Sequence, residues 1–309
     1  MNTPDLGQIN QLMTDMYHAF MSLPLEAQEY FLQTTHDAMS NKNNTSIYTL
    51  LTFKTFYRLA IKHGAKVENG SILEIGAGKP LGTGIFWNFA GANRYTSIDK
   101  FTEINIDDNW IDRFKSLLEF NIFNPYRMSF ESLITVTNTH CTIDEERLRF
   151  IHADLNQHEW KDDKFDFIYS NAVLEHMTNL PLAFKNMYNI LEDNGVMFHS
   201  IDLREHASDR PIADKNTSIE FYKFSIDEWN HRYPPGSDSY INRLRVSDYR
   251  SLFKNAGFSI ISEDITQTMP LTSEVYKEIH PDFHHYSLPD LQATGVQFVL
   301  RKPVENSNN

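Results

Sequence analysis

The chain has 309 residues, 41% of them hydrophobic and 22% charged, which is enough to bury a core for one catalytic domain with additions. Its formal net charge of -13 disfavours a nucleic-acid partner, because such proteins use Lys and Arg to neutralise phosphates. No secretory signal pattern opens the chain, and no apolar stretch approaches the ~18 residues of a membrane helix. We expect a cytoplasmic protein without a membrane partner, and its single cysteine, Cys141, excludes an intrachain disulfide.

The N-terminal part of the chain is predicted to be helical. Apolar side chains recur at helical spacing within residues 1–66, and a polar run at 40–46 separates two such stretches. The pattern changes after this point to short apolar runs. We therefore expect an N-terminal helical cap over residues 1–66 and a main domain over residues 67–309.

Short apolar runs then alternate with segments of helix length, which is typical of buried parallel strands and their crossovers. Strands are predicted at 71–75, 95–98, 149–153, 165–170, 195–202, 258–265 and 296–301. Helices are predicted at 81–90, 180–192 and 246–256. This alternation indicates an α/β fold with a mostly parallel sheet.

The connection between the second and third strands is longer than one crossover helix requires. We interpret residues 103–147 as an insertion, with a helix at 110–120 and an ambiguous apolar run at 134–137. The cap and this insertion are expected to lie over the carboxyl edge of the sheet and to form part of an acceptor pocket.

A glycine-rich turn follows the first predicted strand. Gly76, Ala77 and Gly78 allow a sharp turn and the close approach of a ligand to backbone amides at a helix start. Asp99 ends the second strand, where a carboxylate can accept the hydroxyls of an adenosine ribose. Leu81 stands where the dinucleotide fingerprint requires its third glycine, which counts against a nicotinamide cofactor.

These residues resemble the large family of Rossmann-like S-adenosylmethionine-dependent methyltransferases. The acid-x-Gly-x-Gly motif of the family is matched by Glu74, Gly76 and Gly78, and Pro80 departs from the common third glycine. Further motifs follow in the family's order at 152–155, 165–177, 191–202 and 242–260. The resemblance implies a Rossmann-like three-layer sandwich with a seven-stranded sheet whose last strand is antiparallel.

The resemblance also implies S-adenosyl-L-methionine as cofactor, lying across the carboxyl ends of the first strands. Asp154 stands where the family often places an acid that contacts adenine. The residues expected to bind the cofactor are Glu74, Gly76, Ala77, Gly78, Asp99, Asp154, Leu155 and Asn171. The general look of the chain is similar to bacterial methyltransferases that act on small molecules or glycans.

Chemistry at the acceptor is expected after the fourth and fifth strands, because open α/β sheets bind ligands beyond the strand carboxyl ends. His176 is the candidate general base for an acceptor hydroxyl, Asp202 is a candidate to orient it or take the proton, and His206 is the reserve. His176 also fits a structural role against the cofactor, and Asp202 fits that of a cap.

Two other functions remain open at this point. One is a nicotinamide-dependent oxidoreductase, which would share the glycine turn and Asp99. The other is a non-catalytic partner subunit that binds S-adenosylmethionine. His280 and His284 are four residues apart, but Pro281 argues against one helix presenting both, and no metal site is predicted.

Overall fold

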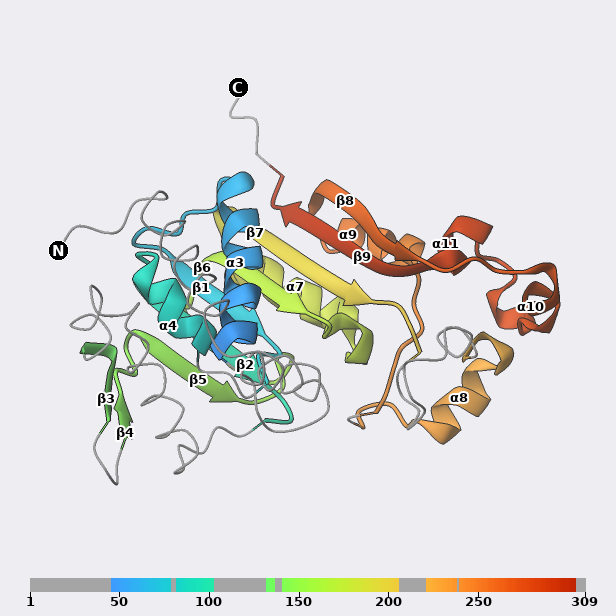
Figure 1. Cartoon of the computed structure of the whole chain (residues 1–309), viewed down its shortest axis with the longest axis horizontal. Coiled ribbons are helices and arrows are strands. Elements are labelled where there is room, and N and C mark those ends of the chain that lie inside the picture. Colours follow the sequence, from blue (N-terminus) through green and yellow to red (C-terminus); the bar gives the residue numbers. More distant parts are fainter. Residues whose placement is uncertain are drawn as a thin grey trace, which may run out of the picture. The chain divides into compact units, whose positions relative to one another are not determined.

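The computed structural model describes residues 46–78, 82–102, 132–136, 141–205, 221–237 and 239–303 (Figure 1). Several predictions fall outside these ranges. They are the first part of the cap, most of the insertion with its helix at 110–120, and His206.

Seven strands form one sheet in the order β5-β2-β1-β6-β7-β9-β8. The central strands are β1 (Ser71–Ile75), β2 (Arg94–Asp99), β5 (Leu148–His152), β6 (Phe165–Asn171) and β7 (Leu191–Asp202). β1 pairs with β2 and β2 with β5 in parallel. The late strands β8 (Ser259–Thr268) and β9 (Ala293–Arg301) differ, because β9 runs antiparallel to both β7 and β8. The predicted α/β sheet with an antiparallel last strand is confirmed.

Contacts divide the described residues into two compact units. The first unit contains the described residues up to Asp154 and the short stretch Phe165–Phe167. The second unit contains Leu155–Lys164 and the described residues from Ile168 onward. The boundary runs through β6, which gives residues to both units. The proposed division at residue 66 is a different one and stays a prediction.

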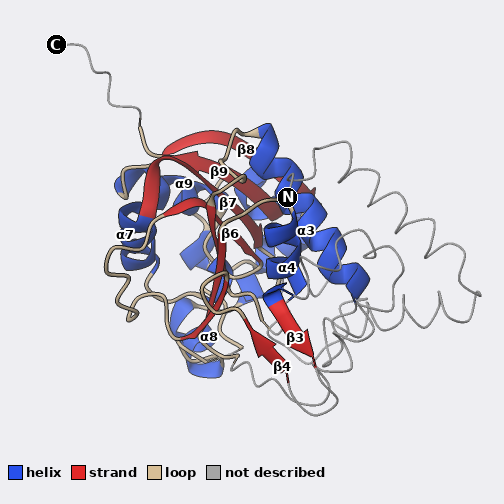
Figure 2. Ribbon diagram, turned by 90° about the vertical axis from the view of Figure 1, so that its left-hand side faces the viewer, coloured by secondary structure: helices blue, strands red, loops and turns tan. Residues whose placement is uncertain are grey.

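The first unit adds helices α3 (Ser46–Lys62) and α4 (Gly82–Phe89) to its strands. α3 and α4 lie side by side (Figure 2), with the Phe53 and Phe86 rings 5.4 Å apart and Trp87 edge-on to Phe53 at 5.2 Å. Trp87 also meets Phe167 of β6 at 5.7 Å. The described helix of the predicted cap therefore belongs to the core of this unit.

A small hairpin is the described part of the insertion. β3 (Ile134–Val136) pairs antiparallel with β4 (Cys141–Ile143). Within the ambiguous run at 134–137, the described residues Ile134–Val136 form a strand, and Cys141 begins its partner.

The second unit contains the remaining helices, α7 (Leu180–Ile190), α8 (Ile226–Arg232), α9 (Val246–Asn255), α10 (Ser273–Glu278) and α11 (Leu288–Gln292), with short 3-10 helices η2 (Leu174–His176) and η4 (Pro281–Phe283). Phe253 of α9 packs between Phe184 of α7, at 4.6 Å, and Phe298 of β9, at 5.1 Å. This contact covers the late strands with two amphipathic helices.

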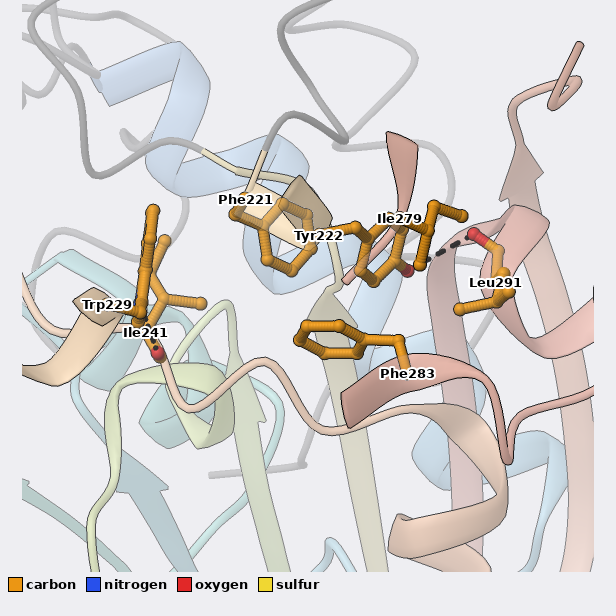
Figure 3. Packing of buried hydrophobic residues seen from close by; sticks show 7 residues of the cluster. All are labelled: Phe221, Tyr222, Trp229, Ile241, Ile279, Phe283 and Leu291. Atoms are coloured by element: carbon orange, nitrogen blue, oxygen red, sulfur yellow. Dashed lines mark hydrogen bonds between the residues drawn. The ribbon is translucent and has the colours of Figure 1, made fainter. Parts of the chain in front are cut away.

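A second core in this unit is aromatic (Figure 3). Its members are buried and come from the segments around α8, η4 and α11: Phe221, Tyr222, Trp229, Ile241, Ile279, Phe283 and Leu291. The two polar groups among them are satisfied, because Trp229 donates to the Ile241 carbonyl at 3.1 Å and Tyr222 to the Leu291 carbonyl at 3.1 Å. We call this group the aromatic cluster.

Candidate functional site

The turn between β1 and α4 has the backbone that the sequence predicts. Gly76 and Gly78 have φ values of 68° and 62°, in the left-handed region where a side chain is strained. The Gly76 amide donates to the Ile98 carbonyl at 2.8 Å, and the Gly78 amide donates to Asp99 Oδ2 at 2.8 Å. Two hydrogen bonds therefore tie the turn to the end of β2.

Asp99 is fixed by backbone amides at both carboxylate oxygens. Its Oδ1 accepts from the amides of Phe101 and Thr102, each at 2.8 Å, while Oδ2 accepts from Gly78. A carboxylate has about four lone-pair sites. Three amide bonds leave acceptor capacity for a ribose hydroxyl and hold the group in one orientation, so this donor and acceptor set fits an adenosine cofactor.

Asp154 lies at the same edge of the first unit. His152 is paired with Asp99 across β5 and β2, and Asp154 follows two residues later. The Asp154 carboxylate forms an ion pair with Lys100 at 3.2 Å. The structure thus brings Gly78, Asp99 and Asp154 to neighbouring strand ends, as the sequence analysis expects.

The Glu74 side chain lies inside the first unit. Its carboxylate is 6% exposed, and Oε2 accepts hydrogen bonds from Thr83 Oγ1 at 2.8 Å and from the Tyr95 hydroxyl. Thr83 belongs to the first turn of α4 and Tyr95 to β2, so the acid joins three elements behind the glycine turn. The structure shows this supporting role, and direct contact of Glu74 with the cofactor stays a prediction.

For three more residues that are predicted to bind the cofactor, the structure gives the location but no contact that indicates a role in binding. Ala77 is buried within the glycine turn, at 9% exposed. Leu155 is buried in the second unit, where its carbonyl accepts from Asn186 at 3.5 Å. Asn171 ends β6 and is exposed. Their cofactor roles stay predictions.

His176 ends the short helix η2 in the second unit. Its Nδ1 lies 2.7 Å from the carbonyl oxygen of Tyr240. A carbonyl only accepts, so Nδ1 carries the proton, and the neutral imidazole has its lone pair at Nε2. This tautomer suits a general base that acts through Nε2.

Asp202 is held by a neighbouring arginine. Arg204 donates to Asp202 from Nε at 2.9 Å and from Nη2 at 2.6 Å, a two-pronged pair that fixes the carboxylate plane. The Tyr240 carbonyl contacts His176 at Nδ1, and Asp202 is paired with Arg204 two residues away. The predicted role of Asp202 in orienting His176 or taking the proton stays a prediction.

Glu175 adds a buried acid next to this pair. Its side chain is 1% exposed, and Oε1 accepts from the Asp202 amide at 3.3 Å. Burial raises the pKa of the Glu175 carboxyl well above its usual value, and the charge of Asp202 acts in the same direction. Both causes favour the protonated form of this buried carboxyl.

Two residues next to His176 and Asp202 could not be found from the sequence. Tyr240 contributes a main-chain carbonyl and lies 64 residues after His176, so no motif spacing joins them. Arg204 lies close to the fifth strand, but its pairing with Asp202 depends on a loop conformation that residue patterns do not encode.

Within the described residues no group of three or more His, Cys, Asp or Glu side chains is arranged to hold a metal ion. His280 and His284 have local partners, the Asp282 amide at 3.2 Å and the Ile279 carbonyl at 3.0 Å. None of the described helices is both long enough and apolar enough to cross a membrane.

The strand order, the left-handed glycine turn and the acid that ends β2 define the class as a Rossmann-like methyltransferase. The chain belongs to the methyltransferase domain family, whose model matches residues 28–263. S-adenosylmethionine is the cofactor of this class, which confirms the cofactor prediction and decides against the nicotinamide alternative.

One curated relative is sterol 24-C-methyltransferase erg6 of Aspergillus fumigatus, which is 24% identical over 143 residues. The match covers 46% of this chain and 35% of that protein, so the chain spans about a third of the relative it matches.

Solved structures with a similar course of the chain include two bacterial methyltransferases. The S-adenosylmethionine-dependent methyltransferase from Mesorhizobium loti is 14% identical, with a TM-score of 0.44 over 80% of this chain and 97% of that one. The TehB-like methyltransferase from Corynebacterium glutamicum is 12% identical, with a TM-score of 0.41 over 91% of this chain and 100% of that one.

The glycine turn leads to a first prediction about the cofactor. Asp99→Ala should weaken binding of S-adenosylmethionine roughly 10- to 100-fold, because a hydrogen bond to a charged group contributes ~1.5–3 kcal/mol. Titration calorimetry measures this against Asp162→Ala, which removes an exposed carboxylate elsewhere. Wild-type affinity in a folded Asp99→Ala protein would remove Asp99 from the cofactor site.

Proposed function

We propose that this protein transfers the methyl group of S-adenosylmethionine to a hydroxyl of a small-molecule or glycan acceptor. The observation that carries the proposal is the 2.7 Å contact between His176 Nδ1 and the Tyr240 carbonyl oxygen, which favours the tautomer with its lone pair at Nε2. An acceptor hydroxyl must lose its proton as the new bond forms. A neutral imidazole of fixed orientation is suited to receive it.

The cofactor would supply a methyl group bound to a sulfonium. The leaving group is then a neutral thioether, which needs no acid from the protein. The chain therefore has to bind the cofactor and the acceptor, align them with each other and remove a proton from the acceptor. In the first unit, Asp99 would accept hydrogen bonds from the adenosine ribose, and Asp154 offers a further acceptor. In the second unit, His176 would take the proton of the acceptor hydroxyl at Nε2.

The Asp202–Arg204 pair belongs to the second unit, as His176 does, and is proposed to contact the acceptor there. Both side chains are partly exposed, at 19% and 30%, and the pair neutralises itself. Such a surface binds a neutral polyhydroxyl acceptor without strong attraction for phosphates, which agrees with the acidic net charge of the chain.

The proposal is tested with acceptors that differ in one atom. A panel of hydroxylated sugars and phenols is incubated with S-adenosylmethionine, and S-adenosylhomocysteine is measured. Each active acceptor is then compared with its deoxy and amino analogues. Product only from the hydroxyl form supports O-methylation, whereas product from the amine or from a carbon acceptor contradicts it.

The non-catalytic alternative has a separate outcome in the same assay. A partner subunit would bind S-adenosylmethionine in calorimetry but form no S-adenosylhomocysteine with any acceptor in the panel. Binding together with turnover excludes that alternative.

A further inference from the structure

The segment Tyr240–Asn242 forms hydrogen bonds to the turn that carries His176. The Asn242 amide donates to the Glu175 carbonyl at 2.8 Å. Its side-chain Nδ2 donates to the carbonyl of Leu174 at 2.8 Å and to that of Met177 at 3.3 Å. With the bond from His176 to Tyr240, four contacts join segments more than 60 residues apart in the sequence.

The turn depends on such contacts because it is weak by itself. η2 is only three residues long, and Val173 before it forms no side-chain capping bond. A single 3-10 turn leaves its last carbonyls without partners in the helix and has little stability alone. Asn242 supplies donors to the carbonyls of Leu174 and Glu175 within the turn and to that of Met177 at its end, although the Leu174 carbonyl also accepts from the Met177 amide at 3.3 Å.

Asn242 is itself held in place. Its Oδ1 accepts from the Leu244 amide at 3.1 Å and from the Tyr249 hydroxyl at 3.3 Å. The main-chain and side-chain nitrogens of Asn242 thus donate to the turn, and its Oδ1 accepts from the segment that leads into α9 and from Tyr249 of α9. An aspartate lacks the two donors of Nδ2, and a glutamine displaces them by one methylene.

The preceding residue connects this segment to the aromatic cluster. Ile241 is buried there, and Trp229 donates to its carbonyl (Figure 3). The following residue, Arg243, has φ 58° and donates to the carbonyls of Phe221 and Phe224 at 2.8 Å each. Because both neighbours are fixed in a core, Asn242 is a rigid support.

We propose that Asn242 is a positioning residue that sets the place and the tautomer of the His176 imidazole. It keeps the turn in register with the Tyr240 carbonyl, so that Nδ1 carries the proton and Nε2 the lone pair. Its effect on turnover rests on the proposed function of His176 as base. Its effect on the tautomer does not.

The test uses Asn242→Asp, which keeps the shape of the side chain. The substitution replaces the Nδ2 donors with an oxygen that faces the carbonyls of Leu174 and Met177. Nitrogen NMR of histidine-labelled protein, with the His176 signal assigned from His176→Gln, reports the tautomer without any acceptor. We expect a protonated Nδ1 in the wild type and loss of that single tautomer in Asn242→Asp. Asn255→Asp, an exposed asparagine at the end of α9, is the matched control.

The kinetic consequence is a roughly 10- to 100-fold fall in kcat with S-adenosylmethionine affinity within a factor of about two, since a small displacement of a catalytic group is costly. Tyr249→Phe removes only one bond to Asn242 Oδ1 and should show a smaller shift in the same direction. Tyr249→Phe serves as the second variant if the melting temperature of Asn242→Asp is well below that of the wild type.

The outcomes separate the two proposals. An unchanged His176 tautomer in both folded variants overturns the positioning role of Asn242. A changed tautomer with wild-type kcat supports that role and overturns His176 as the base. A changed tautomer together with a lower kcat supports both.

Discussion

Replacing His176 with glutamine is expected to lower methyl transfer by ~10²–10⁴-fold, the usual contribution of a positioned general base. Glutamine keeps a side-chain donor for the Tyr240 carbonyl but has no basic nitrogen. The protein should therefore fold and bind S-adenosylmethionine as before. Single-turnover methyl transfer measured against pH shows the effect, because the wild-type rate should rise as the imidazole loses its proton and the variant should lack that rise.

The control is His231→Gln, which changes an exposed histidine of α8 in the same unit. It should keep the rate and pH profile of the wild type. A His176→Gln enzyme with an unchanged rate and profile would return His176 to a structural role. Asp202→Asn is expected to act through Arg204 and the loop shape, with a smaller loss.

Acid should destabilise the second unit through His199. This residue of β7 is fully buried, its Nδ1 pairs with Ser170 Oγ at 2.8 Å, and burial lowers its pKa to about 3. The unfolded chain takes up a proton below pH ~6.5, whereas the folded chain does not. The free energy of unfolding should therefore fall by about 1.4 kcal/mol per pH unit from roughly pH 6.5 toward the folded pKa.

The measurement is denaturant unfolding at several pH values with Ser170→Ala/His199→Leu as the test variant. This pair removes both partners, so that no polar group is left alone in the core, and its stability should fall less steeply with acid than that of the wild type. The surface variant His231→Gln should follow the wild type. Equal slopes for all three proteins would show that His199 does not remain neutral when folded.

Most of the fold could be predicted because buried strands are visible as apolar runs. β1 has the predicted bounds, and β2, β5, β6 and β9 differ by a few residues at most. β7 starts earlier, at Leu191 instead of 195, and its residues at 192–194 are exposed and polar. A hydrophobic pattern cannot find such residues, since they are exposed and polar within the strand.

The part of the candidate site that lies at the ends of parallel strands could be predicted from the order of the strands. Gly78, Asp99 and Asp154 meet because parallel strands end at one edge, which strand order alone implies. The support of His176 was not predictable. Tyr240 acts through its carbonyl, and Asn242 acts from a loop whose position depends on the aromatic cluster packing around Trp229.

We propose above all that this protein moves a methyl group from S-adenosylmethionine to an acceptor oxygen. Single-turnover reaction with methyl-labelled S-adenosylmethionine and the hydroxylated acceptor panel tests it most directly, with the label located by NMR of the product. The account predicts label on oxygen, formed in equal amount with S-adenosylhomocysteine and lost with the deoxy acceptor. Label on nitrogen or carbon, or tight cofactor binding with no transfer to any hydroxyl of the panel, would contradict it.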